Sequence, residues 1–397
     1  MADARLPAAD WPQREDLAAL VAALDPHGKG LVRYVGGAVR DTLLGIAVKD
    51  IDMATPLEPP AVIEHLAAAG IRSVPTGLAH GTVTAVLAGG PVEITTLRRD
   101  VSTDGRHATV AFSQSWQEDA ARRDFTINAL YADPRDLTVH DYFGGLDDLE
   151  ARRLRFIGNA EQRIREDYLR ILRYFRFQAR FGSLPADATA EAACSALAPG
   201  LKGLSRERIA SELLLLLALP NPAPTVSRMA ELGVLAVILP EADPTALPLL
   251  IAAEQAHAIA PDPLRRLAAL LPAEPPQVEQ IGARLRLSIA QRKHLATVAA
   301  RAIPEEAARP LAYKVGREAA LDRLLITGGN IAPLADWDIP QFPLKGGMIV
   351  ARGITAGPEV ARILRTVEAQ WVEEKFPDEA RVMALLDAEI TAASGPV

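Results

Sequence analysis

The spacing of hydrophobic and polar residues changes near residue 150, and this change predicts two kinds of structure. Before that point, short alternating or β-branched runs are broken by glycines, with helical stretches between them. We expect strands in residues 31–37, 49–55, 81–97 and 107–112, and a helix in residues 61–70. The first part of the chain is therefore predicted to be a mixed α/β domain.

Beyond residue 150, apolar residues recur at helical spacing in long segments rich in Ala, Leu and Arg. Proline-rich stretches separate these segments, and prolines commonly mark helix ends. Helices are expected in residues 165–181, 206–219, 226–239 and 359–376. The sequence thus predicts an α+β protein, in which a mixed α/β head is followed by helical domains only.

Length and composition are those of a globular protein with more than one domain. The chain has 397 residues, which exceeds one ordinary core, and 49% of them are hydrophobic while 23% are charged. The longest apolar run, residues 213–219, is too short to cross a bilayer, and we expect a cytoplasmic protein. A single cysteine, Cys194, excludes an internal disulfide and a cysteine-based zinc cluster.

The charge is distributed unevenly along the chain. A formal charge of -7 argues against a general polyanion binder. Residues 150–181 nevertheless contain nine arginines and only four acids. Arginine favours phosphate and planar groups, so this segment is a candidate phosphate-binding stripe. A helix face balanced by neighbouring acids is the alternative.

Two aspartates stand one residue apart in the predicted strand KDIDMAT. Asp50 and Asp52 project from one face of that strand, and their carboxylates repel each other unless a cation lies between them. Hard oxygen ligands at this spacing suit Mg²⁺. Capping of a strand end is the alternative, but Glu93 in PVEITTLR can add a third acid from a neighbouring strand. We predict a metal site formed by Asp50, Asp52 and Glu93.

A glycine pair comes just before this strand. Gly36 and Gly37 precede a helix that begins AVRD, where the backbone can approach an anion closely, and Arg40 lies on that helix. A tight turn without a ligand is the alternative, and neither a dinucleotide nor a P-loop fingerprint occurs. The glycines, Arg40 and the acidic trio together predict a nucleoside triphosphate site and nucleotidyl transfer.

Two further segments carry candidate binding residues. In RRDFTINAL, Asp124 and Asn128 are predicted to share a helix face and to bind a ribose hydroxyl, while the preceding Arg123 binds a phosphate. A helix N-terminal turn capped by Asp124 is the alternative. In residues 165–177, candidate polar residues recur every three positions, with apolar residues behind them: Asp167, Arg170, Arg173 and Arg176. An ordinary amphipathic helix is the alternative.

The motifs in this order resemble the class II CCA-adding tRNA nucleotidyltransferases and bacterial poly(A) polymerases, a branch of the polymerase β superfamily. GGAVRD with KDID resembles the first motif of that family. The other similar segments are the flexible segment in 101–112, the ribose motif in 121–131, the base-recognition helix in 165–177, the motif after it in 204–213, and an RNA-holding tail in 342–371, where Gly347 replaces the usual aspartate.

The resemblance implies a domain order and partners. It predicts an N-terminal helical extension (1–24), a catalytic head (25–157), a neck (158–220), a body (221–330) and a tail (331–397). The body and tail are expected to bind the acceptor arm of tRNA through its shape and phosphates. No obligate protein partner and no membrane are implied.

The resemblance also implies that Asp167 and Arg170 act as an amino-acid template. A carboxylate and a guanidinium complement the base edges of cytosine and adenine, whereas uracil and guanine reverse donor and acceptor. The wrong bases would leave buried polar groups unpaired at a cost of about 1–3 kcal/mol each. The site is therefore expected to accept CTP and ATP.

The expected mechanism is two-metal phosphoryl transfer. Asp50 and Asp52 would hold two Mg²⁺ ions, and Glu93 would help at the ion that activates the RNA 3′-hydroxyl. Gly37, Arg40 and Arg123 would hold the triphosphate, and pyrophosphate would leave.

Several alternatives stay open. A poly(A) polymerase is disfavoured because TGLAHGTVT (76–84) is similar to the CCA-adding version of that strand. Addition of only CC or only A is disfavoured because DVSTDGRHA (100–108) resembles the lever of complete CCA enzymes. The acidic trio argues against an inactive RNA-binding scaffold. An appended His-Asp phosphohydrolase is not expected, since only His257 and His294 follow residue 150.

Overall fold

The computed structural model describes residues 4–103, 108–301 and 307–393, and it divides into two compact units, Met1–Pro240 and Glu241–Val397. The first unit holds a mixed sheet and the helices that follow it, and the second is helical. The predicted α+β class is confirmed. The division after Pro240 falls inside the predicted body (221–330), and the boundaries of the predicted parts within each unit stay predictions. No helix in the described segments is long and apolar enough to cross a membrane.

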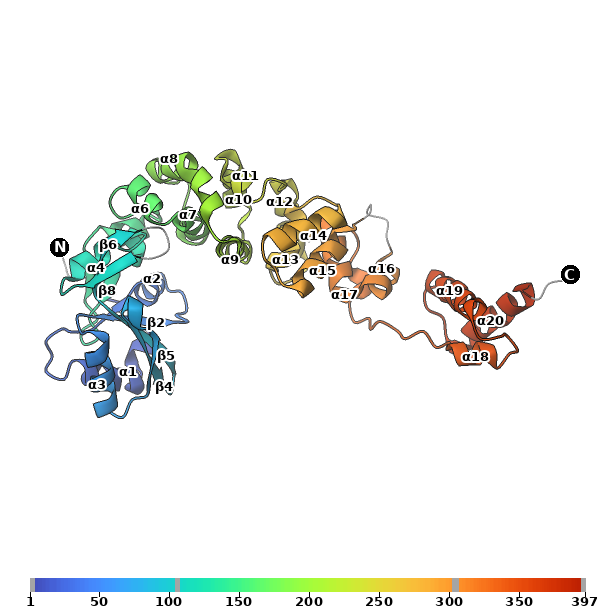
Figure 1. Ribbon diagram of the computed structural model, residues 1–397, viewed down its shortest axis with the longest axis horizontal. Helices are drawn as coiled ribbons and strands as arrows, with labels where there is room; N and C mark the ends of the chain where they lie inside the picture. The colour runs from blue at the N-terminus through green and yellow to red at the C-terminus, as the bar shows by residue number, and fades with distance from the viewer. Residues whose placement is uncertain (1–3, 104–107, 302–306, 394–397) are drawn as a thin grey trace. The chain divides into compact units, whose positions relative to one another are not determined.

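The head is built on a sheet whose described strands run in the order β3-β4-β5-β2-β1-β8-β9 (Figure 1). β2 pairs in parallel with β5, and the other neighbours are antiparallel. The strands are β1 (Arg33–Val35), β2 (Ile51–Thr55), β3 (Ser73–Gly77), β4 (Thr82–Leu87), β5 (Gly90–Thr96), β8 (Leu130–Ala132) and β9 (Val139–Asp141). A separate pair joins β6 (Arg98–Thr103) to β7 (Ala108–Phe112). Side chains alternate as predicted in β5, where Val92 and Ile94 are buried and Glu93 is exposed.

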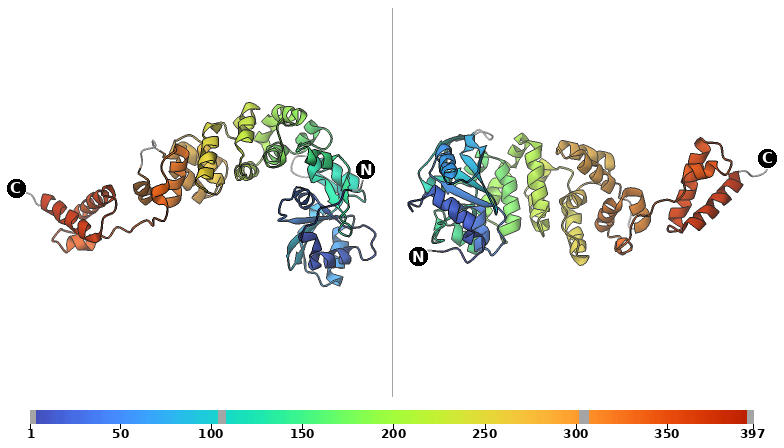
Figure 2. Two further views of the ribbon diagram at one scale, coloured as in Figure 1. Left: turned by 180° about the vertical axis from the view of Figure 1, so that it is seen from behind. Right: turned by 90° about the horizontal axis from the view of Figure 1, so that it is seen from below.

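Helices of the first unit cover the sheet and continue into the neck. They are α1 (Glu15–Leu24), α2 (Gly37–Leu43), α3 (Pro59–Ala68), α4 (Trp116–Ala121), α5 (Gly145–Glu150), α6 (Ala160–Glu166), α7 (Leu169–Phe181), α8 (Ala188–Leu197), α9 (Arg206–Leu217), α10 (Ala223–Glu231) and α11 (Val234–Ile238). α7 packs on α9 and α10, and the views of Figures 1 and 2 show these green helices together. Leu169, Leu172 and Phe175 form the buried face of α7, as the helical spacing predicts. The single helix expected in 226–239 is interrupted at Gly233, whose φ is 74°.

The N-terminal segment packs onto the head. The Trp11 indole Nε1 donates a 2.9 Å hydrogen bond to Thr42 Oγ1 on α2. The Trp11 ring also meets the edge of Tyr34 on β1, with the ring centroids 4.7 Å apart. Aromatic contact and hydrogen bond together fix α2 against the sheet. This segment therefore braces the helix that follows the glycine turn.

The second unit is helical throughout its described part. Its helices are α12 (Leu247–Ala256), α13 (Pro263–Leu270), α14 (Pro275–Arg284), α15 (Ile289–Ala299), α16 (Ala308–Val315), α17 (Arg317–Thr327), α18 (Gly346–Val350), α19 (Pro358–Glu373) and α20 (Glu379–Ala393). Buried charges join α12 to α13, because Glu254 accepts hydrogen bonds from both Arg265 and Arg266. Such a cluster is stable only when every charge has its partner.

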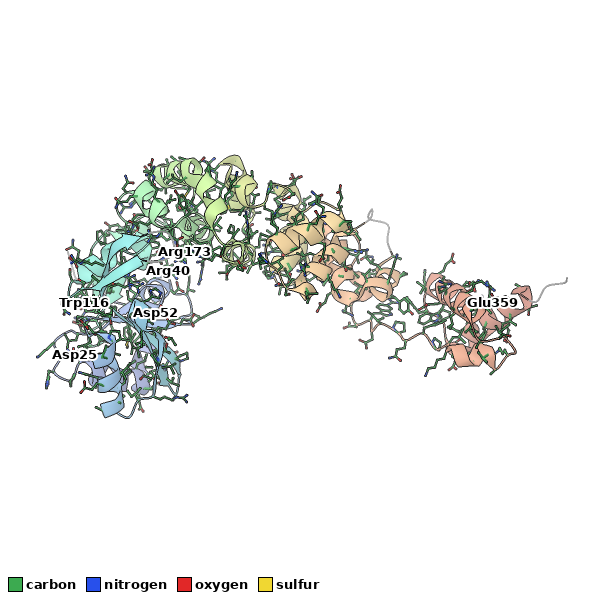
Figure 3. The ribbon with its side chains drawn as sticks, in the orientation of Figure 1. Asp25, Arg40, Asp52, Trp116, Arg173 and Glu359 are labelled. Atoms are coloured by element: carbon green, nitrogen blue, oxygen red, sulfur yellow. The ribbon has the colours of Figure 1, made fainter. Side chains whose placement is uncertain are left out.

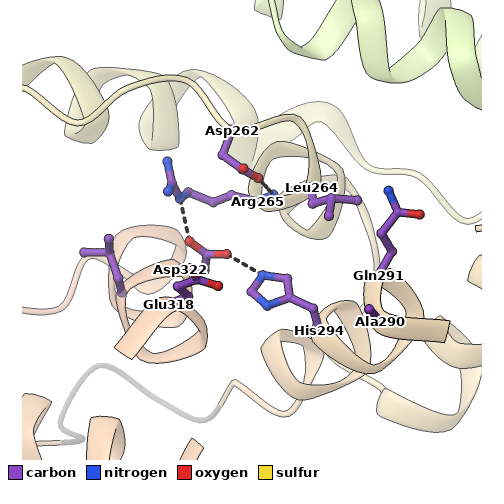
Figure 4. Close-up of a pocket in the computed structure, with 9 residues that line it drawn as sticks. Asp262, Leu264, Arg265, Ala290, Gln291, His294, Glu318 and Asp322 are labelled. Atoms are coloured by element: carbon purple, nitrogen blue, oxygen red, sulfur yellow. Dashed lines mark hydrogen bonds and ion pairs between the residues drawn. The ribbon is translucent and has the colours of Figure 1, made fainter. Parts of the chain in front are cut away.

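A pocket of about 380 Å³ lies between α13, α15 and α17 (Figure 4). His294 Nε2 lies 2.8 Å from Asp322 Oδ2, and Arg265 Nε donates to Asp322 Oδ1 at 2.6 Å. The hydrogen bond to Asp322 raises the pKa of His294, while burial opposes the shift and the nearby Asp262 and Glu318 carboxylates reinforce it. The protonated form of His294 is thus favoured by folding.

The raised pKa of His294 predicts a pH dependence of the second unit. Protonated His294, paired with Asp322, contributes fully to the stability of the folded state below pH 6.5, the ordinary histidine pKa. This contribution is lost as the pH rises through the higher pKa of His294 in the folded protein. We expect the wild-type unfolding temperature of this unit to fall as pH rises through neutrality, and His294→Gln to reduce that fall. Thermal unfolding of both proteins at a series of pH values around neutrality measures this difference. His257→Gln, at an exposed histidine, should leave the fall unchanged, and an equal effect of both variants would contradict the assignment.

Candidate active site

The glycine turn lies between β1 and α2. Gly36 has φ 68° and ψ -117°, a conformation that side chains with a Cβ rarely adopt. A Cβ on Gly36 would also lie 3.5 Å from the Arg123 guanidinium and from the Asn128 carbonyl oxygen. Gly37 then begins α2. The turn therefore requires glycine at position 36 and brings the chain close to the segment that carries Arg123.

Three acidic side chains lie on or next to the interior strands β2 and β5 of the sheet, and we call this group the acidic edge. Asp52 on β2 is directly opposite Glu93 on β5, and Asp50 precedes β2. Burial raises the pKa of Asp52 to about 6, the charges of Glu93 and Asp50 add to the shift, and Arg123 opposes it. The strand register thus brings like charges together, at an electrostatic cost that a cation would relieve.

These carboxylates fit a metal site in which substrate phosphates and waters supply the remaining ligands. Within the described segments, no three Asp, Glu, His or Cys side chains are grouped closely enough to hold a metal ion by themselves. No described Lys or Arg makes an ion pair with Asp50, Asp52 or Glu93 either, and the field of Arg123 offsets the charge of Asp52 only in part. Mg²⁺ is commonly held by one or two carboxylates together with waters and substrate phosphates. The donor set therefore suits Mg²⁺ with a triphosphate.

Arg40 is buried and fully engaged, which differs from the predicted phosphate contact. Its guanidinium donates to Asp41 at 2.8 and 2.6 Å and to Asn128 Oδ1, and it lies 4.1 Å from the centre of the Phe181 ring. Burial lowers the pKa of Arg40 even though Asp41 opposes the shift. With 5% of its surface exposed, Arg40 is placed to orient Asn128.

Arg123 lies nearer to the acidic edge. It donates to Asp119 Oδ2 at 3.1 Å and to the Tyr131 hydroxyl at 3.2 Å. Burial alone would lower its pKa, but Tyr131 and Asp119 raise it. Arg123 is therefore a fixed positive charge whose field reaches Asp52 and the glycine turn.

Asp124 and Asn128 are brought together, although not on the predicted α-helix. The chain forms only a short 3-10 helix, Thr126–Asn128, because Phe125 is extended and pairs with Phe156. Asn128 Nδ2 nevertheless donates to Asp124 Oδ1 at 3.0 Å. The α-helix predicted here was wrong, but the contact between the two side chains is present.

Arg173 joins this turn to the neck. Its guanidinium donates to Asp124 Oδ2 at 2.9 and 2.6 Å and lies 3.8 Å from Glu212 of α9. Burial alone would raise the pKa of Asp124, but Arg173 and Asn128 hold it below its ordinary value. Figure 3 shows Arg173 and Arg40 on the helix side of Asp52. A continuous polar chain thus runs from α2 through the ribose motif to α7 and α9.

Asp167 and Arg170 lie at the beginning of α7, but they are not paired with each other. Asp167 precedes the helix, which begins at Leu169, and its Oδ2 accepts a 2.6 Å hydrogen bond from Arg208 of α9. Arg170 instead donates to Glu166 and to the Arg163 carbonyl oxygen. Asp167 was predicted as part of the helix surface, and the structure places it one residue before the N-cap.

The arginine stripe is mostly neutralised by acids. Arg176 donates to Glu212 at 2.6 Å, and Arg180 lies 3.3 Å from Asp41. Eight of the nine arginines in residues 150–181 pair with a carboxylate: 153, 155, 163, 165, 170, 173, 176 and 180. The structure therefore favours the alternative of a balanced helix face over a free phosphate-binding stripe.

Several residues of this network were missed by the sequence analysis. Arg208, Glu212 and Glu166 contact the predicted site residues, yet none was a candidate. The available signal was the motif LSRERIASEL, which spaces Arg208 and Glu212 four residues apart on one helix face.

Two predicted segments add little to the site. Residues 104–107 of the predicted lever lie outside the described residues. In the tail, Gly347 is exposed on α18, and a Cβ there would meet no described atom within 4 Å. Packing therefore does not exclude the aspartate that is usual at this position.

Comparison with known proteins agrees with this arrangement. A family model described as the poly A polymerase head domain matches residues 32–155, and one described as a probable RNA and SrmB-binding site of polymerase A matches residues 187–245. The Mus musculus protein named CCA tRNA nucleotidyltransferase 1, mitochondrial, is 36% identical over 364 residues, which cover 87% of this chain and 83% of that protein. The chain belongs to the CCA-adding tRNA nucleotidyltransferase and poly(A) polymerase family.

Solved structures and bacterial relatives agree with the family assignment. The Bacillus stearothermophilus CCA-adding enzyme in complex with CTP is 26% identical, has a TM-score of 0.73, and matches 97% of this chain and 100% of that one. A Streptococcus pyogenes CCA-adding enzyme is 43% identical over 198 residues, 49% of this chain and 48% of that protein. The resemblance predicted from the motifs is confirmed.

The pair between Arg173 and Asp124 predicts a large effect on stability. Arg173→Gln would remove the cation paired with the Asp124 carboxylate, which is 11% exposed, at a cost of about 1–3 kcal/mol. Denaturant unfolding of the first unit should show a loss of that size. Arg165→Gln, which breaks an exposed pair with Glu161, should change stability by less than about 1 kcal/mol. Equal effects of the two variants would contradict the structural role of Arg173.

Proposed function

We propose that this chain is a CCA-adding tRNA nucleotidyltransferase. It extends the 3′ end of tRNA with C, C and A from CTP and ATP, without a nucleic-acid template and with release of pyrophosphate. One structural observation carries the proposal: the polar chain from Arg40 to Glu212 links α2 and the ribose motif of the head to α7 and α9 of the neck within one compact unit. Similarity to the mouse relative over most of both chains supports the complete activity.

The reaction is a substitution at the α-phosphorus. The RNA 3′-hydroxyl oxygen attacks, its proton is lost, and the bond to pyrophosphate breaks. Asp50, Asp52 and Glu93 would hold two Mg²⁺ ions, since their charges meet at the acidic edge without a cationic partner. When bound, Mg²⁺ neutralises phosphate charge and lowers the pKa of the attacking hydroxyl.

The head would orient the sugar and the triphosphate. Gly36 and Gly37 leave room for phosphate oxygens beside the Arg123 guanidinium, which is the fixed positive charge closest to the turn. Asp124 and Asn128 would receive the ribose hydroxyls, each with its orientation already set by a guanidinium. Arg40 acts through Asn128 rather than on phosphate directly.

The neck would read the base. Asp167 offers carboxylate oxygens to the exocyclic amine of cytosine or adenine, and Arg170 donates to the neighbouring ring nitrogen. Arg173 and Arg176 support this face of α7 through Asp124 and Glu212. The helices beyond the neck would bind the tRNA acceptor arm.

Other members of the family remain the closest alternatives. A poly(A) polymerase, or an enzyme that adds only CC or only A, would use the same head and neck. The Mus musculus and Streptococcus pyogenes relatives carry CCA-adding names, and the sequence of residues 100–108 supports the complete activity. A cytoplasmic location stays a prediction, because the Mus musculus relative is mitochondrial by name.

The function is tested with three tRNA transcripts: one without CCA, one ending after CC and one ending in CCA. The purified protein is given each nucleotide separately. We expect CTP to be added only to the first and ATP only to the second. Asp52→Ala should abolish both reactions while tRNA binding persists. Long A tails, or addition of one nucleotide type alone, would identify one of the alternatives, and activity in Asp52→Ala would remove the metal assignment.

The template role predicts a loss of selectivity in Asp167→Ala. Without the carboxylate, the amine of cytosine loses its acceptor, and the acceptor of uracil no longer faces a negative charge. The ratio of kcat/KM for CTP over UTP should fall by at least about tenfold, because one unpaired buried polar group is worth that factor. Steady-state kinetics on tRNA without CCA measure the ratio. If both values fall together and the ratio holds, another residue reads the base.

A further inference from the structure

Arg208 holds the carboxylate of Asp167 from the neighbouring helix. Arg208 is the third residue of α9, and its Nη2 donates to Asp167 Oδ2 at 2.6 Å. The other oxygen, Oδ1, accepts from the Leu169 backbone N–H at 3.1 Å. Each oxygen of Asp167 thus has one fixed donor and retains acceptor capacity for a ligand. The orientation of this carboxylate is set before any nucleotide arrives.

The neighbouring charges do not replace Arg208. Arg170, the nearest arginine along α7, is held by Glu166 at 2.5 Å. Arg173 is held by Asp124 and Glu212. Among the described ion pairs, Asp167 is paired with the guanidinium of Arg208. Loss of Arg208 would therefore leave the carboxylate with the Leu169 N–H as its remaining described donor, and its orientation would be less restrained.

The pair lies at the edge of the protein surface. The Arg208 side chain is 36% exposed and that of Asp167 is 28% exposed. Ion pairs at this exposure contribute little to folding, because water screens them and ordering both side chains costs entropy. The ion pair between Arg208 and Asp167 should therefore affect the orientation of the Asp167 carboxylate rather than the stability of the protein.

We propose that Arg208 is a positioning residue that sets nucleotide selectivity through Asp167. This inference rests on the proposed function, since it assigns to Arg208 the preorganisation of the base-reading carboxylate. A less restrained carboxylate would still be present, so catalysis with CTP would continue while discrimination against UTP declines. Arg208→Lys keeps the charge but loses the planar donor geometry and should restore selectivity only in part.

The experiment compares kcat/KM for CTP and UTP on tRNA lacking CCA. Arg208→Gln should lower the CTP-to-UTP ratio by roughly fivefold to tenfold, with unfolding unchanged. Arg206→Gln removes the same charge from the same end of α9 and should leave the ratio unchanged. An unchanged ratio in Arg208→Gln, or an equal fall in both variants, would overturn the proposal. A wild-type protein that adds no C would instead remove the proposed function itself.

A double-mutant cycle separates positioning from direct contact with the base. If Arg208 acts through Asp167, then Arg208→Gln should have no further effect on the ratio in the Asp167→Ala background. Additive losses would show that Arg208 reads the nucleotide independently and would overturn the positioning role. Both single variants and the double variant are measured on the same tRNA.

Discussion

The ion pair between Asp124 and Arg173 connects two parts of the chain that lie 49 residues apart in sequence. The Asp124 side chain, within the ribose motif, is only 11% exposed, and a carboxylate so poorly solvated is destabilising without a cation. Arg173 satisfies it from α7 and is itself supported by Glu212. Together with the ring contact between Phe125 and Phe177, this ion pair gives the sugar-binding turn and the base-reading helix a fixed relative geometry. Arg40 extends the same network towards the glycine turn through Asn128.

Ion pairs balance the charges of the arginines on α7, but not those at the acidic edge. The described arginines of α7 each have a carboxylate partner, whereas Asp50, Asp52 and Glu93 have no ion-pair partner. Burial and the neighbouring acids raise the pKa of Asp52 to about 6. The head therefore keeps a local excess of negative charge in a framework of satisfied ion pairs. A pair of Mg²⁺ ions with a triphosphate would relieve it.

The sequence predicted what depends on local spacing and missed what depends on distant partners. The period of two in KDIDMAT predicted the burial of Ile51 and Met53 on either side of Asp52, and helical spacing predicted the buried side of α7. The pairing of Arg208 with Asp167 could not be predicted, because it needs the packing of α9 on α7. The 3-10 turn at 126–128 also escaped, since its cause is the pairing of Phe125 with a residue far along the chain. For the same reason, the arginine stripe looked free in sequence.

One nucleotide site, formed jointly by the head and the neck, is the central claim of this account. It is tested most directly by measuring how ATP inhibits C addition to tRNA that lacks CCA. A shared site predicts competitive inhibition, with the KM for CTP rising in proportion to ATP concentration while kcat is unchanged. A decrease in kcat without a change in KM would show that ATP binds elsewhere and would contradict a single site.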